Sequence, residues 1–202
     1  MASLSDELPR IDPRIRRSRA ALLEAAVEVV EEQRCAEVSV TEVARRAGVS
    51  RKVVYERFGS GRELIAAAVV HLVQAELMPR LSDEPESAES VLVAAHHLSD
   101  HRAFYKAVLQ GGSAIDVQSA VIELFRPLSR DAARRAFGHL DDRSAAETAE
   151  FLAGATVMAI TRWVVETPDD LDPDAFAGKL LRLMDALAVP RTAPGRGVGG
   201  AR

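Results

Sequence analysis

The sequence has little cysteine and few aromatic residues. Its 202 residues include one cysteine, and aromatic residues make up 4% of the chain. A single thiol cannot form an intramolecular disulfide, which excludes a disulfide-stapled secreted domain and agrees with a reducing compartment. We expect Cys35 to be a small buried residue near a helix end, with a redox switch as the alternative. The 48% hydrophobic content must then be built mainly from Ala, Leu and Val, which favours helices.

A long apolar run and an export signal are also missing. The longest strongly apolar stretch lies between Glu150 and Arg162, which is shorter than the roughly 20 residues that a membrane-spanning helix needs. No opening segment combines a basic start, an apolar run and a small-residue cleavage site. We therefore expect a cytoplasmic protein without a membrane partner.

No catalytic or cofactor motif stands out. The sequence contains no Rossmann-like glycine pattern, and no motif pairs a nucleophile with a base or brings two carboxylates together. We expect no catalytic residues and no cofactor. An enzyme stays the alternative class, because a helical domain can assemble a site from residues that are distant in sequence.

Helical signals fill the first third of the chain. Apolar residues at helical spacing predict a first helix from near Pro13 to near Gln33. Ser39 with Glu42 three residues later has the pattern of a capping box and predicts the start of a second helix. Gly48 suits the left-handed position just past a helix end, and Ser50 can cap a third helix.

The helical pattern continues to Pro190 without sustained strand alternation, so we predict an all-α fold. Ser60 with Glu63 predicts a fourth helix that ends at Pro79. Further helices are predicted near Glu86–His101, Arg102–Leu109 and Asp116–Phe137, from Ser144 capped with Glu147, and from Asp172 onward.

The stretch SVTEVARRAGVSRKVVYERF, Ser39 to Phe58, has the order helix, glycine turn, helix. Its apolar residues can hold both helices against the first one, which leaves Arg51, Lys52 and Tyr55 free to project outward. Such a helix fits the DNA major groove, where Arg or Lys can donate to guanine. Backbone N–H groups at the helix starts, Ser39 and Ser50, can bind phosphate. The stretch therefore predicts a helix-turn-helix that binds DNA.

Charge supports DNA binding weakly. The net charge is −4, but residues 1–62 hold 12 Lys and Arg against 10 Asp and Glu, so the positive excess lies around the predicted helix-turn-helix. A basic run just ahead of the first helix can reach phosphates or can be a solvated helix start, and it consists of Arg14, Arg16, Arg17 and Arg19.

At these residues the sequence resembles the TetR-type (tetracycline-repressor-like) transcriptional regulators. The segments RAALLEAAVEVV and VTEVARRAGVS, the pair Tyr55 and Phe58, and SGRELI match the family pattern without a gap from Arg19 to Ile65. The resemblance implies that Ser39, Thr41, Arg51, Lys52, Val53, Tyr55 and Arg57 contact DNA. The sequence departs from the family at Gly61, where Lys or Arg is usual, and at Arg34 and Cys35, which replace a glycine and an aromatic residue.

The resemblance also implies the domain layout and the function. A helix-turn-helix DNA-binding domain would occupy residues 13–60, and a helical ligand-binding and dimerisation domain residues 61–189. Composition predicts a flexible N-terminal arm at 1–12 and a disordered tail at 190–202. We expect a ligand-responsive regulator, most commonly a repressor, that forms a homodimer through its last two helices. An architectural DNA-binding protein without an inducer is a further alternative.

The small-molecule ligand is unknown, and the aliphatic composition hints at an apolar one. Aromatic and polar groups on otherwise aliphatic helices are the candidates for its pocket, although some of them suit the core or the dimer interface equally well: His97, His101, Tyr105, Phe125, Met158 and Trp163. His97 and His101 are spaced as zinc ligands can be, but only His96 and Asp100 lie nearby in sequence. We therefore expect surface histidines and no metal site.

Overall fold

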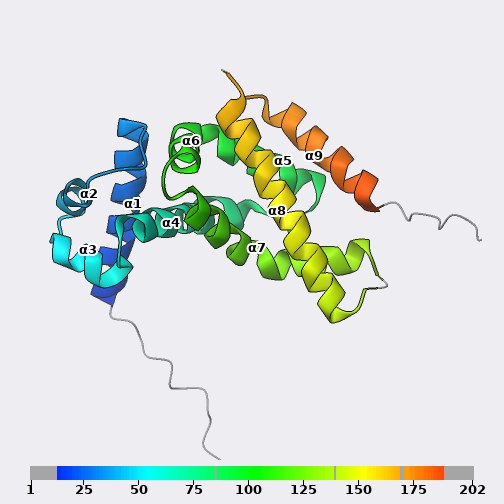
Figure 1. Ribbon diagram of the computed structural model, residues 1–202, viewed down its shortest axis with the longest axis horizontal. Coiled ribbons are helices and arrows are strands. Elements are labelled where there is room, and N and C mark those ends of the chain that lie inside the picture. Colours follow the sequence, from blue (N-terminus) through cyan, green and yellow to red (C-terminus); the bar gives the residue numbers. More distant parts are fainter. Residues whose placement is uncertain (1–12, 85, 139, 169–170, 189–202) are drawn as a thin grey trace, which may run out of the picture.

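The fold is helical throughout the described residues, which are 13–84, 86–138, 140–168 and 171–188 of this computed structural model (Figure 1). The helices are α1 Pro13–Gln33, α2 Val40–Arg46, α3 Arg51–Phe58, α4 Gly61–Leu72, the π-helix η1 Val73–Leu77, the 3-10 helix η2 Met78–Arg80, α5 Ala88–Asp100, α6 Arg102–Gln110, α7 Ala114–Ala136, α8 Asp142–Glu166 and α9 Pro173–Ala188. The all-α prediction is confirmed. The predicted arm 1–12 and tail 190–202 lie outside the described residues, and no helix that is described could cross a membrane.

Helices α1, α2 and α3 gather at one end of the molecule (Figure 1). Val43 of α2 and Val54 and Phe58 of α3 are buried in the same core cluster as the apolar face of α1. Gly48, with a φ of 66°, turns the chain between α2 and α3. Because a side chain at this dihedral would crowd the backbone, glycine suits the tight turn that sets α3 across α2.

The helix caps agree with the sequence in part. The hydroxyl groups of Ser50 and Ser60 accept the backbone N–H three residues later, as predicted. Ser39 precedes α2, but its side chain makes no capping hydrogen bond, so that part of the prediction is wrong. Helix α8 starts earlier than predicted, because the Asp141 carboxylate accepts the Ser144 N–H at 2.7 Å.

Helix α4 connects the two ends of the molecule, packing against α1, α3 and α7 (Figure 1). It ends at Leu72, and the π-helix and 3-10 helix carry the chain on to Arg80, so the prediction of one helix ending at Pro79 is wrong in form. One apolar core runs from α1–α4 into α6, α7 and α8. Movement of the second part of the chain can therefore reach α1 through packed side chains.

A smaller core joins α5 and α9, where Val91, Ala95, Phe176 and Ala177 are buried together. Trp163 of α8 stacks on Phe176, with ring centroids 4.0 Å apart. The outer faces of α8 and α9 stay apolar and exposed at Phe151, Met158, Leu183, Met184 and Leu187.

Candidate nucleic-acid interface

The outer face of α3 is basic and open to solvent. Arg51 and Lys52 are exposed at the start of the helix, and Tyr55 is 45% exposed one turn later. The Lys52 ammonium lies 3.5 Å from the Glu56 carboxylate, a solvated pair within one helix that contributes little to stability. Among the described residues, Arg51 has no carboxylate within ion-pairing distance. The Arg51 guanidinium is thus available to a partner.

Two other predicted DNA contacts of α3 face inward in part. Val53 is half-buried against the main core. Arg57 donates from its Nη1 to the backbone carbonyl oxygen of Ile15 at 3.0 Å. This hydrogen bond ties the end of α3 to the start of α1, so Arg57 orients α3 in the free protein.

The start of α2 and the start of α4 flank this face. Ser39 and Thr41 are exposed beside the first turn of α2. A side chain at Gly61 would come within 3.4 Å of Val40, so this position is closely packed. The guanidinium of Arg62 lies against Gly112 in the turn between α6 and α7.

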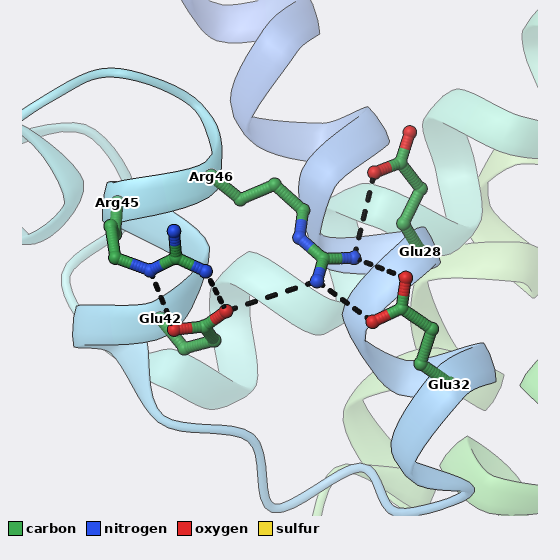
Figure 2. Close-up of polar contacts among 5 residues, drawn as sticks. All are labelled: Glu28, Glu32, Glu42, Arg45 and Arg46. Atoms are coloured by element: carbon green, nitrogen blue, oxygen red, sulfur yellow. Dashed lines mark hydrogen bonds and ion pairs between the residues drawn. The ribbon is translucent and has the colours of Figure 1, made fainter.

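Helix α2 is fixed to α1 by a charged cluster that the sequence analysis missed (Figure 2). Arg46 donates two hydrogen bonds to the Glu32 carboxylate, at 2.6 and 2.7 Å, and lies 3.7 Å from Glu28. Arg45 forms a second two-bond pair with Glu42 within α2. Hydrogen bonds from Arg46 and Arg45 hold the pKa values of Glu32 and Glu42 below their ordinary range. Both arginines of α2 therefore serve the scaffold.

The arginines of the basic run at the start of α1 lie in different environments, one packed against α3 and others exposed to solvent. The Arg19 guanidinium lies over the Phe58 ring, 4.8 Å from its centroid, so it stabilises the contact of α1 with α3. Arg16 and Arg17 are exposed, and the side chain of Arg14 lies outside the described residues. Cys35 is exposed just beyond α1, so the expectation that it is buried is wrong.

The six candidate pocket residues fall into separate environments. His97 and Tyr105 are buried and share a hydrogen bond of 2.8 Å, and His101 lies next to them. The expectation that both histidines lie on the surface is wrong for His97, which is 1% exposed. Phe125 is half-buried against the main core. Met158 and Trp163 belong to α8, where Met158 is exposed and Trp163 stacks on α9.

A cavity of about 330 Å³ opens between α1, α4, η1 and α7. Its lining includes Arg19, Leu23, Val70, His71 and Gln74, and none of the six candidates.

The helix-turn-helix unit with its exposed α3 is similar in sequence to known regulatory proteins. The model of the family described as bacterial regulatory proteins, tetR family, matches residues 22–68, from the middle of α1 to α4. Over these residues the chain is similar in sequence to the tetR family. No curated protein matches the chain.

Solved structures extend the TetR-family fold to the second part of the chain. A TetR transcriptional regulator from Rhodococcus sp. RHA1 is 24% identical with a TM-score of 0.58, covering 86% of this chain and 97% of its own. A putative TetR-family transcriptional regulator from Rhodococcus sp. is 17% identical with a TM-score of 0.59, covering 86% and 100%. NalD, the secondary repressor of the MexAB-OprM multidrug efflux pump in Pseudomonas aeruginosa, is 21% identical with a TM-score of 0.53, covering 85% and 96%. At these identities the likeness concerns the fold.

Proposed function

We propose that this chain is a TetR-type repressor that binds operator DNA as a homodimer and releases it when a small molecule binds. The observation that supports DNA binding best is the exposed basic face of α3. This helix is supported from behind by the buried Val54 and Phe58 and by the Arg57 bond to α1. A rigid helix with exposed cationic side chains can enter the major groove with little loss of conformational entropy.

Each predicted contact residue has a role that matches its environment. Arg51 can donate two hydrogen bonds to a guanine, and Lys52, a mobile point charge, suits a phosphate. Val53, half-buried, can offer an apolar contact to a base. Phosphate contacts fall to the polar groups around the turn and the far end of α3: Ser39, Thr41, Ser50, Tyr55 and Arg57.

The dimer would form through α8 and α9 of residues 61–189. Five large apolar side chains are exposed on these two helices, at fractions from 40% for Met184 to 71% for Phe151. Exposed large apolar side chains that gather on a few elements are typical of protein interfaces. A two-fold axis there would supply the second α3 that an operator with half-sites about 34–36 Å apart requires.

The continuous core supports the proposed release by a small molecule. A ligand that prefers a dimer with wrongly spaced α3 helices lowers operator affinity by its differential affinity for the two conformations. Helix α4, packed on both α1 and α7, is the element that would transmit this change. Repression is supported by analogy with NalD, whose described role is that of a repressor.

The test is a gel-shift titration at two salt concentrations, with DNA from upstream of the protein's own gene and, if needed, sites selected from random DNA. We expect wild-type protein to bind tightly and Arg51→Ala/Lys52→Ala to lose specific binding with its fold intact. The matched control is Arg126→Ala/Arg143→Ala, which removes two exposed positive charges from α7 and α8. Retained specificity in the first variant, or equal loss in the second, would contradict the proposal. A reporter gene behind the bound site distinguishes repression from activation.

A further inference from the structure

Four titratable side chains from three separate segments meet beside the junction of α5 and α6. His101 Nδ1 lies 3.1 Å from Glu31 Oε1 of α1, and His101 Nε2 lies 2.8 Å from Glu76 Oε2 of η1. His97, one turn before His101 on α5, has its ring centroid 5.0 Å from that of His101. One ligand atom each from Glu76, His97 and His101 can be chosen so that all three lie within 4.8 Å of one another.

We propose that Glu76, His97 and His101 bind a divalent transition-metal ion of the zinc class. Two imidazoles and one carboxylate form a donor set that Zn²⁺ accepts, with bonds of about 2.0–2.2 Å. Tetrahedral bonds of that length place donor atoms about 3.3–3.6 Å apart. The ion could be enclosed by side-chain rotations that shift the donors by on the order of 1 Å.

Both histidines have the outer partners that metal-binding histidines usually have. A ligand histidine commonly donates its second N–H to a carboxylate or another oxygen, which fixes the tautomer and the ring orientation. Glu31 stands at Nδ1 of His101, which leaves Nε2 to face the ion beside Glu76. The buried Tyr105 hydroxyl stands 2.8 Å from Nε2 of His97 and leaves Nδ1 for coordination.

The position of the cluster allows an ion to enter. Glu76 and His101 keep 49% and 22% of their side-chain surface, whereas His97 lies beneath them at 1% exposure. Glu76 is carried by a π-helix, a distortion that often occurs at functional sites because it redirects one turn of side chains. Three protein ligands also leave a fourth position for water or for a donor atom of a small molecule.

A simpler interpretation is an ion pair of His101 with two carboxylates, and metal titration separates the two. Chelator-treated full-length protein is titrated with Co²⁺ above pH 7.5, since the histidines must be neutral to coordinate, and then with Zn²⁺ in competition. We expect one ion per chain and the visible absorption of tetrahedral Co²⁺, with displacement by Zn²⁺.

The ligand variants are Glu76→Gln and His101→Gln, and each is expected to weaken Co²⁺ binding by a hundredfold or more. Glu31→Gln should weaken it by about 10–100-fold, since it removes an outer partner. The matched control, His96→Gln, removes an exposed histidine of the same helix and should bind Co²⁺ as wild type does. Circular dichroism checks that each variant is folded. If His101→Gln is unfolded, the result for Glu76→Gln, whose side chain is exposed, is the one that tests the proposal. Absence of saturable binding, or equal affinity in wild type and Glu76→Gln, would overturn the proposal.

A regulatory effect of the ion rests on the proposed repressor function. Glu31 precedes Glu32, which holds Arg46 of α2, so an ion that moves Glu31 acts on the attachment of the helix-turn-helix. With metal binding established by Co²⁺ titration, the gel shift is repeated with and without Zn²⁺. We expect operator affinity to change at least fivefold in wild type and to stay constant in Glu76→Gln. Equal operator affinity with and without Zn²⁺ would overturn the regulatory effect. The metal site itself is tested separately by the Co²⁺ titration.

Discussion

Glu32 on α1 and Arg46 on α2 share two hydrogen bonds of 2.6 and 2.7 Å (Figure 2). This bidentate pair joins two elements, whereas the neighbouring pair of Arg45 with Glu42 lies within α2 alone. A single exposed ion pair contributes little to stability, but bidentate geometry fixes an angle as well as a distance. The Glu32–Arg46 pair therefore sets how α2, and through it α3, is held on α1.

Arg46→Ala is expected to weaken operator binding and to lower the thermal unfolding temperature modestly. The pKa of Glu32 is lowered below its ordinary 4.5 mainly by the hydrogen bond from Arg46. The unfolded chain therefore takes up a proton first, so the stabilisation is complete above about pH 4.5 and disappears as pH falls through the lowered value. Calorimetry should show the largest difference between wild type and variant at pH 7, shrinking toward pH 3.

The control for this variant is Arg45→Ala, which removes the same charge from the same helix but leaves the link to α1 intact. It should bind DNA more tightly than Arg46→Ala. Equal loss in both variants would mean that the net charge of α2 matters and its attachment does not.

Single substitutions at Arg51 and Lys52 should affect DNA binding in different ways. A lost base contact costs about 1–3 kcal/mol and relaxes preference at one base pair, whereas a lost phosphate contact weakens binding to all sequences. We therefore expect Arg51→Ala to reduce the ratio of specific to non-specific affinity. Lys52→Ala should keep this ratio and lower the slope of log affinity against log salt by about 1. Identical salt slopes for wild type and Lys52→Ala would exclude the phosphate role.

Phe151→Glu/Met184→Glu is expected to convert the proposed dimer to a monomer, because it places charges on the exposed apolar faces of α8 and α9. Light scattering at micromolar concentration measures the mass directly. Ile115→Glu is the control, since Ile115 is also apolar, is 78% exposed and lies on α7. A wild-type monomer, or a dimer that survives the double substitution, would rule out this interface.

Local sequence signals predicted the helix-turn-helix well. The bounds of α1, the glycine turn and the caps at Ser50 and Ser60 depend on residues within a few positions of each other. Predictions that depended on competition between neighbours were less accurate. Glu42 is held by Arg45, so it does not complete a capping box with Ser39. Asp141, an ionised acceptor, caps α8 ahead of the residue expected to start it.

Contacts between distant residues could not be predicted from one sequence. Glu31 and Glu76 are 70 and 25 residues from His101, so no spacing rule connects them. The spacing of His97 and His101 was visible in the sequence, but the proximity of Glu76, the third proposed ligand, depends on how η1 packs beside α5. The Arg46–Glu32 pair was not predicted for the same reason, since the two residues are 14 positions apart and lie on different helices.

Arg34 adopts a backbone dihedral that favours glycine. Its φ is 51° just past the end of α1, close to the 66° of Gly48 past the end of α2. A side chain in this left-handed region costs roughly 1 kcal/mol. A glycine at position 34 should therefore remove backbone strain, and a side chain at position 48 should introduce it.

Arg34→Gly should stabilise the protein by about 0.5–1 kcal/mol, and Gly48→Ala should destabilise it by about 1 kcal/mol. No atom lies within 4 Å of an added Cβ at Gly48, so the second effect isolates the backbone. Urea unfolding of the two variants measures both changes in the free energy of unfolding. A destabilised Arg34→Gly would mean that the Arg34 side chain makes a contribution larger than the strain it imposes.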